Sequence, residues 1–258
     1  MLESYVRERL REKEILLMTH IVLGYPSLED SFRIVETMVE AGVDLMELQI
    51  PFSEPVADGP VILRANQEAL RKGVKVKDCL ACAGRIAGAF PIPFLVVSYY
   101  NIPFRYGVRS FAAAMADLGL SGAIFPDLPP EEGEEVLEAM CRHGLSPILL
   151  FSPSTPAERM RHLAEIGRGF IYCVARKGVT GGETPFSEDL SRYLARCRQA
   201  TTLPLAVGFG LSRGSDVEFL KGKADIAVVG SEVIRLMDRD GLSSVGPFLR
   251  ALQPGFRS

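Results

Sequence analysis

Two polar residues interrupt an apolar stretch that otherwise has the composition of a buried β-strand. In VDLMELQI, residues 43–50, Glu47 and Gln49 alternate with apolar residues and therefore point to the same face of the predicted strand. Burying a carboxylate without a partner is costly, and carboxylates in such positions are candidates for general acid or general base chemistry. A structural ion pair between Glu47 and a basic side chain is the alternative, and the strand alone leaves both interpretations open.

A second carboxylate follows in the turn-rich segment 51–66, PFSEPVADGPVILRAN. The polar residues that this segment would carry over the end of the sheet are Ser53, Glu54 and Asp58. Asp58 precedes a Gly-Pro pair, so it could equally form a turn or cap a helix that starts near residue 61. The segment supplies a second acid within reach of Glu47, and two acids in different environments can take different roles.

Three later apolar runs end in glycine-rich turns. The turns are RKGVTGG at 176–182, GFG at 208–210 and GS at 230–231, and the last one begins a short helix over 232–237. Glycine lets backbone N–H groups approach an anion closely, and a helix N-terminus carries a partial positive charge. Together the turns predict a phosphate-binding site. The alternative for each glycine is a tight strand-to-helix turn that binds nothing.

Eight apolar runs predict the β-strands that position these residues. They span residues 15–22, 43–50, 93–99, 122–126, 147–151, 170–175, 203–208 and 225–230. The segments between them place apolar residues three and four positions apart, which predicts amphipathic helices. The clearest of these helices cover 27–42, 110–120, 130–144, 155–167 and 212–222. Alternation of buried strands and helices requires a parallel sheet, because each crossover returns the chain to the same end.

The simplest arrangement of these α/β units is a closed (β/α)8 barrel, the TIM-barrel architecture. We expect a single domain over residues 1–258, with an N-terminal helix at 1–14 and the barrel at 15–258. A doubly wound open sheet is the alternative. It is disfavoured because LGYP follows the first strand, where a dinucleotide-binding fold would have GxGxxG. In a barrel, active sites lie at the carboxyl ends of the strands, where the acids and the glycine turns would meet.

Composition narrows the class of partner. The 258 residues include 29 basic and 32 acidic side chains, so the net charge of −3 provides no broad positive field for nucleic acid or a membrane surface. Residues 1–14 contain no apolar block that could serve as a signal or membrane span. Five cysteines, an odd number, favour reduced thiols and a cytoplasmic location. Cys79 and Cys82 form a CxxC with no second pair, so packing is favoured over metal or redox use, and no metal is expected.

Several motifs together resemble one known family. ELQIPFSEPVADGP, YYNIPFRYG, FPDLPPEE, GFIYCVARKGVTGG, AVGFG and VVGS occur in the order and approximate spacing of tryptophan synthase alpha chains, over nearly the whole sequence. The resemblance implies a barrel lyase that cleaves the carbon–carbon bond of indole-3-glycerol phosphate by a retro-aldol step, giving indole and glyceraldehyde 3-phosphate. It also implies that Glu47 is the catalytic acid and base. Asp58 would accept a hydrogen bond from the indole N–H and stabilise the cationic ring.

The resemblance also assigns the substrate-binding residues. Tyr172 matches a tyrosine near the substrate, and Thr180 matches the threonine of the sixth loop, which closes over the ligand. The remaining matches to the phosphate site are Gly181, Gly208, Phe209, Gly210, Gly230 and Ser231. Three positions depart from the family pattern, one of which is Ala175, where serine is common. Gln49 stands where glycine is usual, and His20 stands where a bulky apolar residue is common, so we expect Gln49 to fill that space and donate to Glu47 or to the substrate.

The same resemblance implies a partner and a cofactor. The partner would be a tryptophan synthase beta chain, in a hetero-tetramer of two alpha and two beta chains, and pyridoxal phosphate would reside in the beta chain and not in this one. Segments 101–107 and 127–132 carry apolar and proline residues suited to a docking face, although ordinary loop packing would explain them too. Alternative functions are a free-standing indole-producing lyase, another phosphosugar barrel enzyme, or a ligand-binding subunit that activates a partner and has weak chemistry of its own.

Overall fold

Eight parallel strands form a closed barrel in the computed structural model of this chain, which describes residues 2–174, 188–208 and 210–253. The strands are β1 (Leu16–Val22), β2 (Leu45–Gln49), β3 (Phe94–Val97), β4 (Gly122–Ile124), β5 (Ser146–Phe151), β6 (Ile171–Val174), β7 (Leu205–Gly208) and β8 (Ile226–Val229). Each strand pairs with the next, and β8 pairs with β1. That last pairing confirms the predicted barrel and excludes the open sheet.

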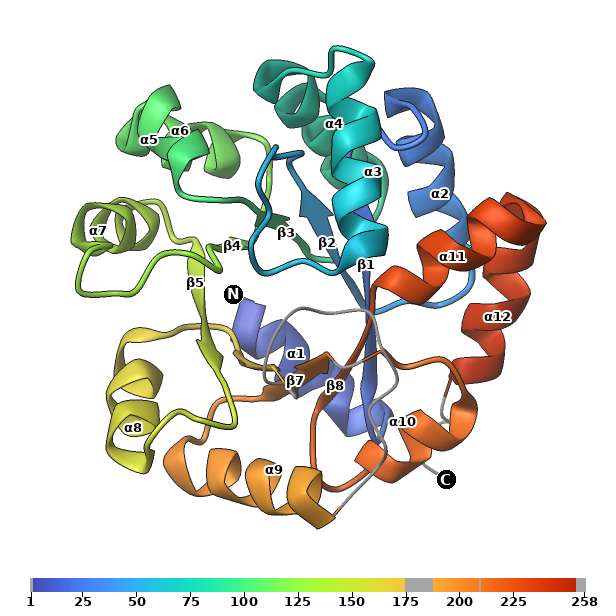
Figure 1. Cartoon of the computed structure of the whole chain (residues 1–258). Coiled ribbons are helices and arrows are strands. Elements are labelled where there is room, and N and C mark those ends of the chain that lie inside the picture. The colour runs from blue at the N-terminus through green and yellow to red at the C-terminus, as the bar shows by residue number, and fades with distance from the viewer. Residues whose placement is uncertain (1, 175–187, 209, 254–258) are drawn as a thin grey trace.

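Helices surround the strands as a ring (Figure 1). The helices of the described residues are α1 (Leu2–Glu12), α2 (Leu28–Glu40), α3 (Pro60–Arg71), α4 (Val76–Ala89), α5 (Asn101–Tyr106), α6 (Val108–Asp117), α7 (Glu134–Arg142), α8 (Ala157–Ile166), α9 (Glu188–Ala200), α10 (Gly214–Leu220), α11 (Ser231–Asp240) and α12 (Val245–Leu252). A short 3-10 helix covers Leu242–Ser244. In the part of the chain that the structure describes, no helix is long and apolar enough to cross a membrane.

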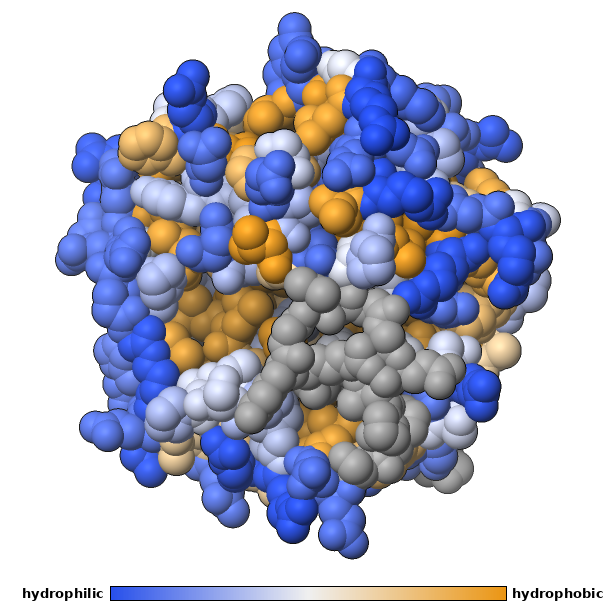
Figure 2. All heavy atoms as spheres, viewed as in Figure 1, coloured by the Kyte–Doolittle hydropathy of each residue, from blue (hydrophilic) through white to orange (hydrophobic). Residues whose placement is uncertain are grey.

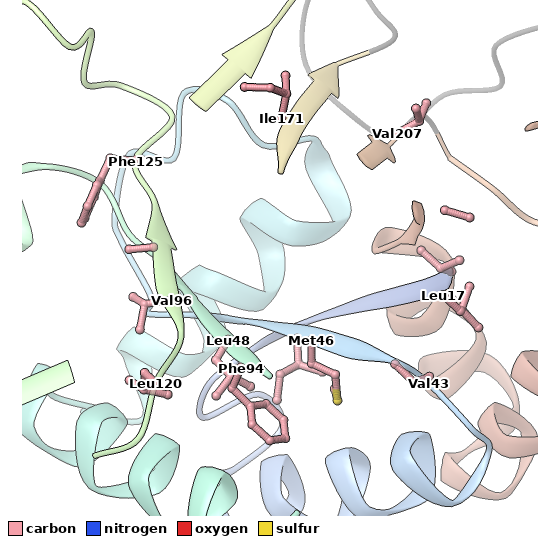
Figure 3. Packing of buried hydrophobic residues seen from close by; sticks show 14 of the residues in the cluster. Leu17, Val43, Met46, Leu48, Phe94, Val96, Leu120, Phe125, Ile171 and Val207 are labelled. Carbon is pink, nitrogen blue, oxygen red and sulfur yellow. The ribbon is translucent and has the colours of Figure 1, made fainter. Parts of the chain in front are cut away.

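Side chains point alternately to the two faces of each strand, and the two faces contribute to two separate hydrophobic cores. Met46 and Leu48 on β2 and Phe94 on β3 belong to the larger core between the strands and the helices, and Figure 3 shows them on the helix side of the sheet. Leu45 and Met18 belong to the smaller core inside the barrel. Because side chains alternate between faces, Glu47 and Gln49 point to the same side as Leu45, into the barrel. The strand pattern therefore directs the polar pair inward.

Helix α1 closes the amino-terminal end of the barrel. Its Leu2 and Val6 are buried in the interior cluster, and the hydroxyl of Tyr5 donates to the backbone carbonyl of Asp44, just before β2. The Asp44 carboxylate accepts from Lys13 Nζ at 2.8 Å and from the backbone N–H of Leu17 at 2.9 Å, and both ion-pair partners are buried. The buried pair attaches the end of the α1 segment to β1 and β2, which carry the polar residues.

Replacing Asp44 with alanine is therefore expected to lower the free energy of unfolding by about 3 kcal/mol, because it leaves the buried ammonium of Lys13 without this carboxylate. Urea unfolding measures the change. The control is Glu3→Ala, which breaks the exposed pair between Glu3 and Arg7 and should cost less than about 1 kcal/mol. Equal losses in the two variants would contradict the structural role of the buried pair.

Candidate active site

A cavity of about 190 Å³ lies at the carboxyl ends of the strands. The described residues that line it are His20, Glu47, Ala57, Asp58, Ile62, Val97, Ile124, Pro126, Leu150, Tyr172, Val174, Gly208, Gly210, Val228, Gly230 and Ser231. Most of the wall is apolar, and the polar groups come from different strands, as expected for a barrel site. Figure 2 shows a hollow of hydrophobic residues near the middle of the face that Figure 1 presents.

Glu47 lies at this cavity and is 3% exposed. The register of β1 and β2 places His20 opposite Glu47, and His20 Nδ1 lies 3.0 Å from Glu47 Oε2. The second oxygen, Oε1, is buried and has no hydrogen-bond partner among the residues that the structure describes. One oxygen is thus held by an imidazole, and the other is available to a ligand. In residues 2–174, 188–208 and 210–253, the partner of Glu47 is therefore a histidine, and the alternative of a structural pair with an arginine or lysine does not occur.

Gln49 connects His20 to the second carboxylate. Its Oε1 lies 2.8 Å from His20 Nε2, and its Nε2 donates to Asp58 Oδ2 at 2.7 Å. The sequence predicted that Gln49 would donate to Glu47 or to a ligand. Donation to Glu47 was wrong, because the imidazole of His20 lies between the two side chains and the amide reaches Asp58 instead. Donation to a ligand stays a prediction.

Asp58 has a side-chain partner in addition to Gln49. The hydroxyl of Tyr99 donates to Asp58 Oδ2 at 3.2 Å and accepts from the backbone N–H of Ala57 at 3.0 Å. Helix α3 begins after Gly59, with no side-chain hydrogen bond to its N-cap. Asp58 is therefore a member of the cavity wall, and the interpretation as a helix cap does not hold.

The charges of this cluster shift the proton affinities of its members. Burial alone would lower the pKa of His20, but the hydrogen bond to Glu47 and the charges of Glu47 and Asp58 outweigh it and raise that pKa above its ordinary value. Burial raises the pKa of Asp58, while the Gln49 hydrogen bond and the His20 charge oppose the increase. Burial raises the pKa of Tyr172 well above its usual range, and the charges of Glu47 and Asp58 raise it further. The hydroxyl of Tyr172 therefore keeps its proton and remains a donor.

The glycines that β7 and β8 bring to the cavity differ in why they are glycine. A β-carbon built at Gly208 would overlap the hydroxyl of Tyr172, so this residue must be small to let Tyr172 reach the cavity. Gly210 has a φ of +80°, a conformation that side chains disfavour. Gly230 is the N-cap of α11, and a β-carbon there would meet only His20 at ordinary contact distance. The sequence left open that each glycine merely allows a turn of the backbone. Of these three glycines, Gly210 alone has the positive φ that this alternative requires.

The structure brings together seven of the ten predicted site residues. These are Glu47, Asp58, Tyr172, Gly208, Gly210, Gly230 and Ser231, which all line the cavity. The other three, Thr180, Gly181 and Phe209, lie outside the described residues. Two contacts of the carboxylates were not predicted. His20 contacts Glu47, and Tyr99 contacts Asp58. Neighbouring positions on adjacent strands could have indicated the first, but the second depends on a loop conformation.

Comparisons with known proteins identify the family. The family model described as "Tryptophan synthase alpha chain" matches residues 6–245. The chain belongs to this family. The alpha chain of Desulforapulum autotrophicum is 64% identical over 98% of this chain and all of the relative, and that of Syntrophotalea carbinolica is 59% identical with the same coverage.

Solved structures agree with this membership. A structure of Mycobacterium tuberculosis tryptophan synthase in its aminoacrylate-bound form matches with a TM-score of 0.87 at 31% identity, covering 97% of both chains. A chain from Aquifex aeolicus matches with a TM-score of 0.91 at 31% identity, covering 100% of this chain and 99% of that one. Both the resemblance inferred from the motifs and the predicted fold are therefore confirmed for this member of the alpha chain family.

The close approach of Gly208 and Tyr172 predicts a coupled effect on stability. Gly208→Ala should lower the free energy of unfolding by about 1–3 kcal/mol because the new methyl group overlaps the phenol. Tyr172→Phe removes the overlapping hydroxyl, so the same glycine substitution should cost about half as much in that background. Urea unfolding of the two single variants and the double variant measures the coupling. Strictly additive losses would contradict the inferred contact.

Proposed function

We propose that this alpha chain cleaves indole-3-glycerol phosphate by a retro-aldol reaction, as a carbon–carbon lyase, and that it works as a subunit with a tryptophan synthase beta chain. The observation that carries the proposal is the arrangement of the cavity. Glu47 and Asp58 share one wall, and Gly208, Gly210 and the N-terminus of α11 line another. In this cavity the indole ring of the substrate would lie between apolar walls and contact the two acids, while the phosphate at the end of its side chain would bind main-chain amides.

Glu47 is suited to the proton transfers of this reaction. Breaking the bond between the ring and the side chain requires that the ring carbon be protonated first, which gives a cation with a C=N bond. The electrons of the broken bond then neutralise that cation, and the adjacent hydroxyl becomes a carbonyl as its proton leaves. We assign both transfers to Glu47 Oε1, the buried oxygen without a described partner. One proton is donated to carbon and one is taken from oxygen, so Glu47 returns to its starting state.

Asp58 is suited to stabilise the cation. A carboxylate beside the ring N–H interacts more strongly with the protonated ring than with the neutral one, which lowers the barrier rather than merely tightening binding. The hydrogen bonds from Gln49 and Tyr99 hold Asp58 Oδ2, and both favour its ionised form because they donate to it. Its orientation is therefore set before the substrate arrives.

The phosphate is assigned to the glycine wall. Ser231 begins α11, a ten-residue helix whose N-terminus carries a partial positive charge, and Gly230 precedes it. Gly208 and Gly210 lie on the same cavity, and we include Gly181, Phe209 and the loop residue Thr180 in this site as part of the proposal. Binding the phosphate away from the breaking bond would orient the substrate without taking part in the chemistry.

The proposed reaction needs no external oxidant or reductant, and its two proton transfers can be performed by carboxylates. We therefore assign no cofactor and no metal to this chain, and we assign pyridoxal phosphate to the beta chain. A complex of two alpha and two beta chains in the cytoplasm completes the proposal. A free-standing lyase remains distinguishable from the subunit, because only the subunit would copurify with a beta chain and respond to it.

Exposed apolar residues support the subunit role. Segment 101–107, predicted to be a loop, is mostly helix α5, and its Phe104 and Tyr106 are 63% and 43% exposed. Val56, in the loop between β2 and α3, is 70% exposed at the same end of the barrel. These three are the exposed large hydrophobic residues of the described part of the chain. Aromatic residues exposed in this way are typical of protein interfaces.

Substitution of the carboxylates tests the catalytic assignment. Glu47→Gln should lower kcat for indole release by about a thousandfold, because the amide cannot transfer the protons. Asp58→Asn should lower kcat by about a hundredfold with a much smaller change in KM, since its charge acts on the cation. The control is Glu54→Gln, which alters an exposed carboxylate of the same loop and should leave both constants unchanged. Undiminished indole release by Glu47→Gln would refute the assignment and favour a binding subunit.

Substitution at α5 tests the docking face. Phe104→Ser should weaken binding of the beta chain by about tenfold or more, because an exposed aromatic residue at an interface contributes strongly to affinity. Its effect on the free energy of unfolding should stay within about 0.5 kcal/mol. Titration calorimetry with the beta chain measures the affinity. Ala251→Ser, at an exposed position of α12, is the control, and equal affinity of both variants would place the interface elsewhere.

A further inference from the structure

His20 and Gln49 form a buried bridge between the two carboxylates of the cavity. Glu47 Oε2 lies 3.0 Å from His20 Nδ1, and His20 Nε2 lies 2.8 Å from Gln49 Oε1. Gln49 Nε2 then donates to Asp58 Oδ2 at 2.7 Å. His20 is 5% exposed and Gln49 is fully buried. Hydrogen bonds of this length in a dry environment are strong and directional, so the bridge fixes the relative position of the carboxylates.

The donor and acceptor inventory fixes the direction of this bridge. An ionised Asp58 can only accept, so Gln49 must present its NH₂ group to it and its carbonyl oxygen to His20. The Nε2 of His20 must then carry a hydrogen. Its Nδ1 faces Glu47 Oε2, and this contact is favourable only if one proton lies between the two atoms. The imidazole and the carboxyl group therefore share one proton.

We propose that His20 and Gln49 are positioning residues of the lyase: they hold Glu47 by one oxygen, direct the other toward the substrate, and retain the shared proton. This inference rests on the proposed lyase function. The form that starts the reaction carries two protons at this pair, the shared one between His20 Nδ1 and Glu47 Oε2 and a second on Glu47 Oε1. When Oε1 gives its proton to the ring carbon, the shared hydrogen remains between Nδ1 and Oε2 and stabilises the carboxylate that forms. The hydroxyl proton then returns to Oε1, so the bridge ends as it began.

The surroundings of His20 favour retention of that proton. Its titratable neighbours in the described residues are Glu47 on β2, Asp58 after β2 and, across the cavity, Tyr172 on β6, while Tyr99 on β3 contacts Asp58. From the β8 side, Gly230 contributes backbone only. The two carboxylates dominate this set and raise the pKa of His20. The shared proton is therefore present at low and neutral pH and is lost as the pH rises through that raised pKa.

The pH dependence of kcat separates this role from simple packing. In His20→Leu the pair can no longer share a proton, and an imidazole binds a proton more tightly than a carboxylate does. The alkaline decline of kcat should therefore move to lower pH, with at least a tenfold loss at pH 8, a smaller loss at pH 6, and little change in KM. Gln49→Met, which keeps the length but not the hydrogen bonds, should show the same displacement to a smaller degree.

A conservative variant distinguishes orientation from proton retention. His20→Asn places an amide donor near the position of Nδ1 but cannot titrate, so it should recover kcat at pH 6 more than at pH 8. The control is His143→Leu, which removes an exposed histidine at the end of α7 and should leave the profile unchanged. Wild-type indole release with an unaltered pH profile in His20→Leu would overturn the proposal.

A second measurement does not depend on activity or on the folding of a variant. The chain has three histidines, so the ¹⁵N resonances of its imidazoles can be resolved in a pH titration of the wild-type protein. His20 should stay doubly protonated above the pH at which a free imidazole loses its proton, and Nε2 should keep its hydrogen after titration. If Nε2 loses its hydrogen, the bridge is wrong. If the wild-type chain releases no indole, the lyase function is wrong whatever the imidazole resonances show.

Discussion

The burial of Glu47 in an apolar barrel, beside the partly buried Asp58, is the constraint on which the site depends. Glu47 is 3% exposed, and an isolated charge at such a position would be strongly unfavourable. Among the residues that the structure describes, the partners of these carboxylates are uncharged or proton-sharing groups and not arginine or lysine. His20 contacts Glu47, and Gln49 and Tyr99 contact Asp58. Within the described part of the chain, the carboxylates are thereby held without an arginine or lysine partner, which leaves their charge available to a ligand.

The barrel provides this arrangement through strand register and closure. Pairing of His20 with Glu47 across β1 and β2 places the imidazole beside the carboxylate, and alternation sends both into the interior. At the opposite end, α1 fills the barrel with Leu2 and Val6, and the buried pair of Lys13 and Asp44 attaches this segment to the strands. One end of the barrel is therefore packed for stability, while the other keeps a cavity for chemistry.

Regular features were predictable from the sequence, and loop-dependent contacts were not. The eight strands, the closed barrel and the inward direction of Glu47 follow from the spacing of apolar residues along the chain, which can be read from short segments of sequence. The cavity also contains most of the residues that the family motifs indicated. The contact between Gln49 and Asp58 was not predicted because it depends on where the loop after β2 places Asp58. Segment 101–107 is mostly helix where a loop was expected. Such features are set by tertiary contacts between residues distant in sequence.

The most direct test is a crystal structure with an analogue of indole-3-glycerol phosphate that lacks the side-chain hydroxyl groups and so cannot be cleaved. The account predicts the ring nitrogen at Asp58, the substituted ring carbon facing Glu47 Oε1, and the phosphate on the amides of Gly210 and Ser231. His20 should still contact Glu47 Oε2 in that complex. A ligand bound outside this cavity, or a Glu47 side chain turned away from the ring, would contradict the account.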